Sequence, residues 1–598
     1  MLKGGSFLIE HADPSTVFIP EDATEEQRMI AQMVKDFSRQ EIQEPMQARG
    51  KEFYATDPED RALIVQQLEK AGEMGLCGVA IPEEYGGMGL DFNTGILFSE
   101  AVADGFSFAT TIGAQTSIGS LPIVYYGNEA QKEKYLPGIA TGTTKASYCL
   151  TEPSAGSDAN SGKTKALLNE AGTHYLLTGQ KMWITNGGFA DLFIVFAKID
   201  DDKKLSAFIV EKDFGGIEIG AEEEKLGIKG SSTVQLFFND CPVPVENLLG
   251  DREEGFKMAL NILNTGRIKL AAGSIGGSKF AIDKAVSYAV ERTQFRTSIA
   301  EFGAMQHKIG EMVVKTFVGE SAVYRTGRNI DRAFDQLTDD GQARGEAKLN
   351  AVREFAVEAA LLKFTCSEVL DYVIDEALQI HGGMGYAVET GIEMGYRDAR
   401  ITRIYEGTNE INRMLSVAEL TKRIIKTKEL SVKQAEKRIP RSLVGRIFKW
   451  SLDDEETAIQ NLKYTFLFIS GLAGRKLGKK LVDEQEMVMN MSDILGMAYL
   501  ADSVWLRYKK LKASGQVDAE RLEVIHKIAQ VFIYDACTQA QTCGQEIIHA
   551  FAEGFQRSYM MYFLNSLTTR YVVNAKDLRR DVARSAIDAK GYPFHLVN

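Results

Sequence analysis

One short stretch of the chain combines residue types that could carry out proton chemistry. Residues 403–410 read Arg-Ile-Tyr-Glu-Gly-Thr-Asn-Glu, so the carboxylate of Glu406 is followed directly by Gly407 and by the hydroxyl of Thr408. Glycine permits backbone turns that other residues avoid, and a carboxylate on such a turn can be directed into a pocket as a general base. An exposed turn with no function would have the same composition, so the meaning of this segment depends on the rest of the chain.

Three further segments carry glycines, hydroxyls and aromatic side chains. Residues 148–159 read Tyr-Cys-Leu-Thr-Glu-Pro-Ser-Ala-Gly-Ser-Asp-Ala, residues 183–186 read Trp-Ile-Thr-Asn, and residues 379–386 read Gln-Ile-His-Gly-Gly-Met-Gly-Tyr. Taken singly, the first would be a polar turn, and Trp183 would be a core aromatic on a strand. Together with residues 403–410, in this order and at these distances, they resemble the acyl-CoA dehydrogenase family over roughly residues 30–420.

The resemblance implies an FAD cofactor held by two groups of residues. Glycine allows the backbone to approach a phosphate closely, and arginine offers a pyrophosphate a two-pronged donor. The group expected to bind FAD within one subunit comprises Tyr148, Leu150, Thr151, Gly156, Ser157, Trp183, Thr185, Thr408 and Glu410. The group that in the family contacts the FAD of the neighbouring subunit comprises Arg292, Gln294, Phe295, Gln379, Gly382 and Gly383.

The resemblance also assigns residues to the substrate. Glu406 matches the family's catalytic base, and Arg267 matches an arginine beside it at the thioester end of the acyl-CoA. Removing a weakly acidic α-proton requires a carboxylate whose pKa is raised by a dry site, and the charge on the thioester oxygen requires donors. In the family these donors are the backbone amide of the base and a ribitol hydroxyl of the flavin. The residues expected to bind substrate are Ser157, Asn264, Arg267 and Gly407.

The chain departs from the family pattern in the loop after residue 292. Arg296 stands where family members usually have glycine, and Phe302 stands where some have histidine. If the loop does not tolerate Arg296, its contact with FAD differs from that of the family. Seen alone, Arg292 would be a solvated cation at a helix end, and Arg267 would be a helix-surface arginine paired with a carboxylate.

Composition excludes several classes of protein. The chain has 598 residues, of which 44% are hydrophobic, so we expect several domains. A net charge of −13 argues against a nucleic-acid-binding surface. The six cysteines and seven histidines show none of the spacings typical of metal sites, and the cysteines indicate reduced thiols inside a cell. The N-terminus lacks an apolar signal core and no run of apolar residues is long enough to span a membrane, so we expect a bacterial cytoplasmic protein, with peripheral contact at the inner membrane face as an open alternative.

Hydrophobic patterning predicts a mainly α fold with a central β domain. Helical spacing is expected over residues 25–43, 271–292 and 344–378, whereas short β-rich runs such as residues 192–197 and 207–210 indicate an antiparallel sheet. In the family this order corresponds to an N-terminal helical domain, a β domain and a four-helix bundle. We expect domains at residues 1–145, 146–255 and 256–426, a linker at 427–454 and an additional helical domain at 455–598.

No G-x-G-x-x-G follows a predicted strand, which argues against a nicotinamide site of the Rossmann type. Residues 273–277, Gly-Ser-Ile-Gly-Gly, lie inside a predicted helix and are expected to allow close helix packing.

The expected activity is dehydrogenation of long-chain acyl-CoA to trans-2-enoyl-CoA in fatty acid β-oxidation, with electron-transfer flavoprotein as acceptor and a homodimer as the assembly. The extension after residue 455 resembles that of very-long-chain members, and the small residues at 117–121 match the region that closes the acyl pocket. An acyl-CoA oxidase and a flavoprotein with an assembly or scaffold role remain alternatives. Residues 437–450 combine cations with apolar side chains and are expected to contact anionic lipid, although a helix that packs its apolar face on the protein would have the same pattern.

Overall fold

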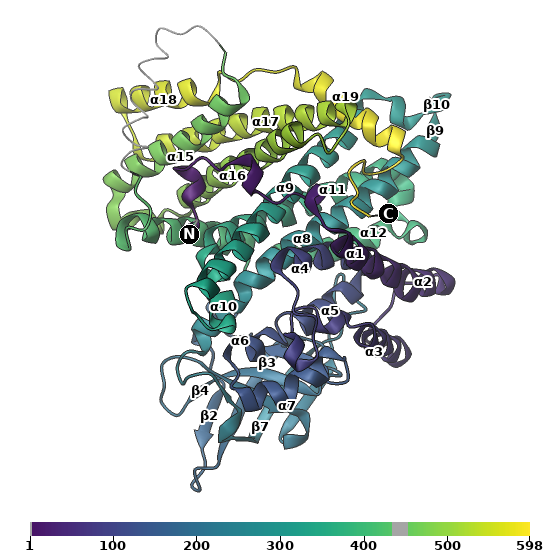
Figure 1. The fold of residues 1–598 in the computed structure, drawn as a ribbon, viewed down its shortest axis with the longest axis vertical. Coiled ribbons are helices and arrows are strands. Elements are labelled where there is room, and N and C mark those ends of the chain that lie inside the picture. The colour runs from purple at the N-terminus through teal and green to yellow at the C-terminus, as the bar shows by residue number, and fades with distance from the viewer. Residues whose placement is uncertain (1–2, 433–451, 598) are drawn as a thin grey trace.

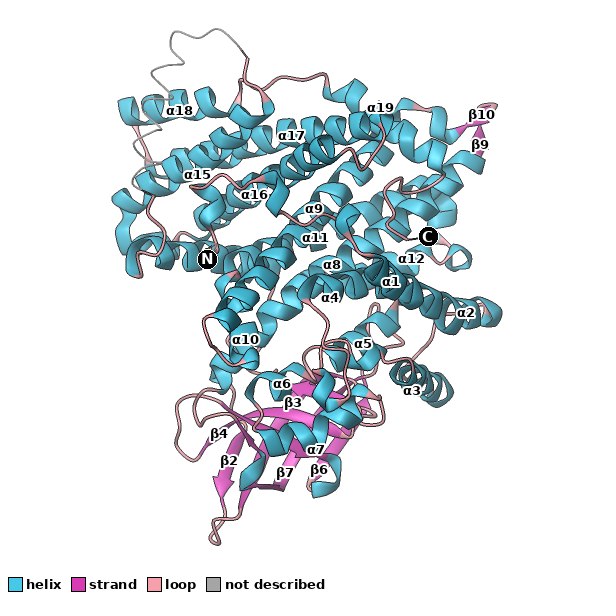
Figure 2. Ribbon diagram, in the orientation of Figure 1, coloured by secondary structure: helices cyan, strands magenta, loops and turns pink. Residues whose placement is uncertain are grey.

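The computed structural model describes residues 3–432 and 452–597. The eight-stranded sheet occupies one end of an elongated molecule, a two-stranded hairpin lies near the other end, and helices make up the rest (Figures 1 and 2). The expected mainly α fold with a central β domain is therefore confirmed. The domain limits expected at residues 145, 255, 426 and 454 remain predictions. The lipid-binding segment predicted at residues 437–450 lies outside the described residues.

Some of the N-terminal helices lie between the sheet and the bundle, whereas others lie against the sheet or beside the bundle (Figure 1). The first begins where sequence predicts, because Thr24 accepts a hydrogen bond from the Gln27 amide and the Gln27 side chain accepts one from Thr24 in return. The helices are α1 (Glu25–Phe37), α2 (Glu44–Arg49), α3 (Pro58–Glu73), α4 (Phe92–Ala101), α5 (Ser107–Thr116), α6 (Leu121–Tyr126) and α7 (Glu129–Ala140).

The sheet is mixed, so the expectation of a purely antiparallel sheet is wrong. Strands β1 (Ala146–Cys149) and β2 (Lys165–Leu168) both pair in parallel with β4 (Leu192–Ile199). Almost every residue of β4 is buried, and a strand covered on both faces reads as a continuous apolar run rather than an alternating one. Each of the remaining strands pairs antiparallel with its neighbours in the sheet. They are β3 (His174–Thr185), β5 (Ser206–Glu211), β6 (Ile217–Glu222), β7 (Thr233–Pro244) and β8 (Leu248–Leu249).

The central bundle supplies most of the walls of the candidate site. The helix expected at residues 344–378 is two helices, because the backbone leaves the helical conformation at Phe355, whose ring is buried in the core. A small hairpin, β9 (Thr293–Gln294) with β10 (Thr297–Ser298), follows the first long helix. The helices are α8 (Gly255–Glu291), α9 (Gly303–Asp339), α10 (Arg344–Glu354), α11 (Ala356–His381), α12 (Ile392–Ala399) and α13 (Asn409–Thr421).

One glycine of the 273–277 segment explains how closely α8 and α4 pack. A Cβ atom on Gly276 would lie 2.1 Å from the carbonyl oxygen of Glu100, far inside van der Waals contact. A Cβ atom on Gly273 would lie 3.5 Å from the Ser99 carbonyl oxygen, which is an ordinary contact. The close helix packing expected at residues 273–277 is therefore found at Gly276.

The C-terminal helices share the core of the bundle. Arg507 of α16 donates to Glu320 of α9 at 2.6 Å, and Arg325 of α9 lies 2.9 Å from Asp502 of α16. Apolar side chains from both parts form one continuous cluster. Among the described residues, no helix is long and apolar enough to cross a membrane. The helices are α15 (Glu455–Leu477), α16 (Gln485–Ser514), α17 (Ala519–Phe551), α18 (Gly554–Thr568) and α19 (Ala575–Ala589).

Candidate active site

Glu406 lies in the loop just before α13 and lines a cavity. Its backbone is left-handed, with a φ of 58°, and one oxygen of its carboxylate, Oε2, is buried without a hydrogen-bond partner among the described residues. The carboxylate packs directly on α8, where a Cβ atom on Gly266 would lie 2.8 Å from both of its oxygens. A strained backbone and an unpaired buried oxygen both cost free energy, and such features concentrate at functional sites.

The surroundings of Glu406 set its charge. Burial raises the pKa of its carboxyl group from 4.5 to about 7, although Arg267 and Lys363 lower it. Arg267 is buried on α8, where its Nε atom donates to the Glu406 carbonyl oxygen at 3.3 Å and its Nη1 atom donates to Asn264 at 2.7 Å. A carboxyl group that titrates near neutral pH can hold or release a proton under physiological conditions.

Asn412 fixes the shape of the loop. This fully buried amide on α13 donates to the carbonyl oxygens of Gly407 at 2.8 Å and Thr408 at 3.0 Å, and to that of Glu406 at 3.4 Å. The Thr408 hydroxyl caps α13 by accepting from the Ile411 amide at 3.3 Å. The Glu406 turn is thereby attached to the start of a helix rather than free in a loop.

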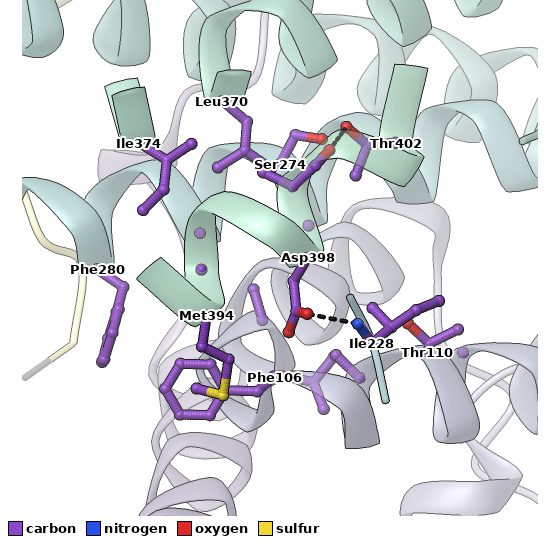
Figure 3. Close-up of a pocket in the computed structure, with 18 of the residues that line it drawn as sticks. Phe106, Thr110, Ile228, Ser274, Phe280, Leu370, Ile374, Met394, Asp398 and Thr402 are labelled. Atoms are coloured by element: carbon purple, nitrogen blue, oxygen red, sulfur yellow. Dashed lines mark hydrogen bonds between the residues drawn. The ribbon is translucent and has the colours of Figure 1, made fainter. Parts of the chain in front are cut away.

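A cavity of about 710 Å³ leads away from Glu406. Side chains of Phe106, Phe280, Ile374, Leu370 and Met394 point toward its interior, so its lining is largely apolar (Figure 3). Gly266, Gly273 and Gly277 of α8 line it too, which leaves room beside that helix. The shape and lining suit an extended hydrocarbon chain that ends at the carboxylate.

A polar group also lies on this cavity. Asp398 of α12 accepts from the Ile228 amide, as the dashed line in Figure 3 marks, and its Oδ2 atom is buried without a hydrogen-bond partner among the described residues. Burial raises the pKa of Asp398 to about 7. We expect its main task to be structural, because the Ile228 backbone is left-handed, with a φ of 45°, and its amide is held by this one side chain.

The segments at 148–159 and 183–186 lie side by side at the edge of the β domain. The amide of Met182 donates to the Thr151 carbonyl oxygen at 3.0 Å, and buried Lys181 lies 2.7 Å from Glu152. The pairing of β3 with β7 shifts register between Lys181 and Ile184, and at this bulge Trp183 has a φ of 59° and remains 53% exposed. Bulges of this kind redirect side chains, and here one turns an aromatic face outward.

These residues fit an FAD ring. Trp183 offers an uncovered aromatic face, and the Tyr148 hydroxyl is buried without a partner among the described residues. Thr185, one of the residues expected to bind FAD, lines the same cavity as Glu406. Gly156 and Ser157 are exposed nearby in the chain, while Leu150 is buried and Thr151 is partly buried. At the other side of the loop, Glu410 is exposed on the first turn of α13.

The second expected FAD group is remote from the first. Arg292, Gln294 and Phe295 are exposed around the β9–β10 hairpin, which lies at the opposite end of the molecule from β2 and β7 (Figure 1). The ends of α8 and α11 meet there, because Tyr288 stacks on His381 with ring centroids 4.3 Å apart, so exposed Gln379, Gly382 and Gly383 belong to the same surface. A single chain does not bring the two groups together.

Arg296 occupies a position whose backbone suits glycine. Its φ is 69°, and that of Phe295 is 51°, so both residues at the tip of the hairpin are left-handed. Two left-handed residues are typical of the tight turn that best matches the twist of a hairpin. The backbone of the hairpin thus accommodates Arg296 with its side chain exposed, and its effect on the contact with FAD stays a prediction.

Comparison with known proteins decides the family. The descriptions "Acyl-CoA dehydrogenase, N-terminal domain", "middle domain" and "C-terminal domain" match residues 24–143, 147–241 and 253–421, and a further C-terminal domain of the family matches residues 461–566. A probable acyl-CoA dehydrogenase of Bacillus subtilis is 41% identical over 99% of this chain and 98% of its own length. This chain belongs to the acyl-CoA dehydrogenase family.

Two other relatives extend the comparison. A crystal structure of an acyl-CoA dehydrogenase complexed with FAD from Bacillus anthracis has a TM-score of 0.93 and 40% identity, and covers 99% of this chain and 100% of the other. The very long-chain specific acyl-CoA dehydrogenase of Mus musculus is 42% identical over 58% of this chain, which spans about half of that relative, 52% of its length. The protein is therefore an acyl-CoA dehydrogenase that uses FAD.

The structure adds residues that the sequence does not single out. Lys363 lies fully buried on α11, and burial lowers the pKa of its ammonium group to about 8 while Glu406 raises it. Its signal in the sequence is a single lysine in the apolar run at residues 359–364. Asn412, which holds three loop carbonyl groups, carries no such signal, because a polar residue one turn into a helix is common.

Proposed function

We propose that Glu406 removes the α-proton of the acyl thioester. The observation that carries this proposal is its unpaired, buried carboxylate oxygen at the wall of an apolar cavity, with a pKa raised to about 7. Desolvation strengthens a carboxylate as a base, and neighbouring Arg267 and Lys363 keep part of the population ionised at neutral pH.

The other residues bind and orient the acyl-CoA. Arg267, which is oriented by its hydrogen bond to Asn264, holds the Glu406 turn from α8. The backbone amide of Glu406 donates to the thioester oxygen, where charge develops when the α-proton leaves. Trp183 and Thr185 would hold FAD, which would supply the acceptor for the β-hydrogen, removed as hydride. The α-proton passes to Glu406, a double bond forms between the α- and β-carbons, and the product is trans-2-enoyl-CoA.

The substitution Glu406→Gln tests this assignment. The amide keeps the size of the side chain but cannot take up the proton, so kcat should fall by about 10²–10⁴-fold while FAD and acyl-CoA still bind. Turnover and flavin absorbance should be measured on the same preparation. Near-normal turnover in the flavin-loaded variant would show that another group is the base.

We also propose that long acyl chains are the preferred substrates. The support is the 710 Å³ cavity, its glycine-lined α8 wall, and the position of Ser117 and Ile118 on the lining, within the segment of small residues at 117–121. Each methylene group buried contributes about 0.8 kcal/mol, so a deep apolar cavity favours longer chains. A maximum of kcat/KM at four or six carbons would contradict this proposal.

Electron-transfer flavoprotein is the acceptor that we propose, on the family resemblance. An oxidase would instead pass electrons to O₂. Turnover with long-chain acyl-CoA in air should therefore release little hydrogen peroxide and should accelerate on addition of the flavoprotein. Stoichiometric peroxide without added acceptor would indicate the oxidase alternative.

We further propose that each FAD is shared by two subunits of a homodimer. The support is the separation of β3, which carries Trp183 and Thr185, from the β9–β10 hairpin (Figure 1). Arg292 and Phe295 are exposed at this hairpin, and Phe295 is 89% exposed. An uncovered aromatic side chain beside an arginine is suited to cover a cofactor that projects from a second copy.

A further inference from the structure

A chain of polar contacts leads from the C-terminal helices toward Glu406. It begins at Asp493 of α16, whose Oδ1 atom accepts from the Nε atom of Arg413 on α13 at 2.7 Å. The two Nη atoms of Arg413 donate to both carboxylate oxygens of Glu368 on α11, at 2.7 and 2.8 Å. The guanidinium group also lies over the ring of Phe364, 4.2 Å from its centroid. One planar side chain thus joins three helices in a fixed geometry.

The next contact reaches the residue that starts α13. Asn409 is buried, and its Nδ2 atom donates to Glu368 at 3.1 Å and to the Ser367 hydroxyl at 3.1 Å. Its Oδ1 atom accepts from the Lys363 ammonium group at 2.8 Å. Lys363 is the cation that acts on Glu406 from α11, so the orientation of the Asn409 amide determines where that charge is held.

The same helix controls the backbone of the base. Asn409 follows Glu406 by three residues, and Asn412, on the same turn of α13, holds the carbonyl oxygens of residues 406–408. A second contact between α13 and α16, the 2.7 Å hydrogen bond between the hydroxyls of Ser416 and Ser492, lies one turn after Arg413. A shift of α13 along α16 would therefore move the Glu406 turn and the charge behind it together.

We propose that the C-terminal helical domain positions the catalytic base through Asp493, which holds Arg413 and, through it, Asn409, Lys363 and the Glu406 turn. Asp493 is a positioning residue. This proposal rests on the assignment of Glu406 as the base. Under this proposal, the extension after residue 455 contributes to the reaction as well as to the hydrophobic core.

The charged and titratable groups around this chain of contacts come from six helices and strands and from the loop before α13. Glu406 faces Arg267 of α8, Lys363 of α11 and Tyr148 of β1, with Tyr405 next to it in its own loop. Around the remainder lie Glu368 of α11, Glu410 and Arg413 of α13, Arg403 of the preceding loop, Asp493 of α16, and Cys543 and Glu546 of α17. Asp493 is the member of this set through which α16 contacts Arg413.

The test compares two substitutions on one helix. Asp493→Asn removes the charge that holds Arg413. Asp502→Asn removes another charge on α16, one that pairs with Arg325 of α9 and Lys463 of α15, away from Glu406. Both variants, in the full-length FAD-loaded enzyme, should lose thermal stability. Only Asp493→Asn should lower kcat for palmitoyl-CoA, by about tenfold, with KM changed less than twofold, because a small misplacement of a catalytic group slows the chemical step.

The pH profile supplies a readout that a purely structural contact would not change. Lys363→Met removes a cation that favours ionised Glu406, so the acid limb of kcat/KM should move to higher pH. Asp493→Asn should move it in the same direction and by less, because Lys363 is then held less well. A variant Asp493→Asn with reduced stability but the kcat and acid limb of the wild type would overturn the proposal.

Two further variants keep the outcome decisive. Should Asp493→Asn not fold with FAD, Arg413→Lys retains the charge and loses the two-pronged contact, and wild-type kcat and pH profile in that variant would also overturn the proposal. Glu406→Gln, measured in parallel, distinguishes a failure of the positioning role of Asp493 from a failure of the assignment of Glu406 as the base. If Glu406→Gln is inactive and Asp493→Asn is normal, only the positioning role fails, whereas an active Glu406→Gln removes the base assignment itself.

Discussion

Glu406 combines three features that each destabilise the folded protein. Its φ of 58° costs a non-glycine residue about 1–2 kcal/mol, its carboxylate is largely removed from water, and one of its oxygens lacks a hydrogen-bond partner among the described residues. Gly266 leaves room for the carboxylate on α8, and Asn412 holds the backbone of the turn. The cost is understandable if the group must be basic, and stabilising the turn would remove the property that the reaction needs.

The raised pKa gives a pH dependence of activity with a definite sign. A general base must be ionised in the free enzyme, so kcat/KM should rise as pH increases through about 7, where Glu406 loses its proton. Steady-state rates between pH 5.5 and 8.5 test this directly. An acid limb centred near 4.5, the ordinary value for this side chain, would mean that the site does not desolvate the carboxylate.

The same shift predicts a pH-dependent stability. The folded-state pKa of about 7 lies above the ordinary value of 4.5, so the folded protein holds this proton more tightly than the unfolded chain does. The favourable contribution is present below 4.5 and is lost as pH rises through 7. Glu406→Gln lacks the ionised form, so at pH 8 it should be more stable than the wild type by roughly 1–3 kcal/mol, and this advantage should shrink toward pH 5. Equal melting temperatures of the two proteins at pH 8 would contradict the raised pKa.

Sequence alone could predict Glu406 and Arg267 because both lie in recognisable motifs. It could not predict Lys363 or Asn412, because their roles come from the packing of α11 and α13 against the loop, and contacts between helices leave no mark on local spacing. Asp398 is a similar case, since its partner, the Ile228 amide, lies 170 residues away in the chain.

At the scale of the element, the glycines of α8 serve two purposes. Gly276 allows close packing on α4, whereas Gly266, Gly273 and Gly277 line the cavity. Gly276 faces the Glu100 carbonyl oxygen of α4 at a distance that no side chain fits, so Gly276→Ala should destabilise the protein by about 1–3 kcal/mol. Gly273→Ala is the matched control for stability, since its Cβ would make an ordinary contact and alanine favours a helix. Differential scanning fluorimetry of the two variants should show a lower melting temperature only for Gly276→Ala.

Helix α5 offers a way to change the chain-length preference. Gly113 lines the cavity, and nothing lies within 4 Å of the Cβ that a side chain there would have, so Gly113→Leu should fold and fill part of the cavity. The kcat/KM ratio of palmitoyl-CoA to octanoyl-CoA should fall, by about fourfold for each methylene group that no longer fits.

A matched control for this variant is Gly95→Leu in α4. Its Cβ would also meet nothing within 4 Å, and Gly95 is not part of the cavity lining. The chain-length ratio of this control should equal that of the wild type. An unchanged ratio in Gly113→Leu would mean that the acyl chain takes another path.

Element boundaries show where local patterns succeed and fail. The periodicity of residues 344–378 continues across Phe355, yet the chain bends there because the ring is buried in the core between α10 and α11. The parallel pairs of the sheet could not be predicted from the sequence for a related reason. A run such as residues 192–197 shows that a strand is buried, but the direction of its neighbours depends on long connections that local spacing does not record.

At the scale of the whole molecule, the C-terminal extension and the bundle form one core. Buried ion pairs between them, such as Arg507 with Glu320 and Arg325 with Asp502, cost desolvation and so favour one relative orientation more than they add stability. The contact of Asp493 with Arg413 can position the Glu406 turn only if α16 and α13 keep a fixed orientation relative to each other.

The proposed sharing of FAD between two subunits predicts a specific complementation between them. Arg292→Ala should weaken FAD binding and Glu406→Gln should abolish the proton transfer, so each homodimer should be nearly inactive. A heterodimer of the two, isolated by two different affinity tags after co-expression, contains one site with an intact Glu406 in one chain and an intact Arg292 from its partner. Because that site is complete, the heterodimer should recover about half of the wild-type activity, and light scattering should show a dimer. If Arg292 instead contacts the FAD of its own chain, both sites of the heterodimer lack one residue, and activity should stay at the level of the homodimers.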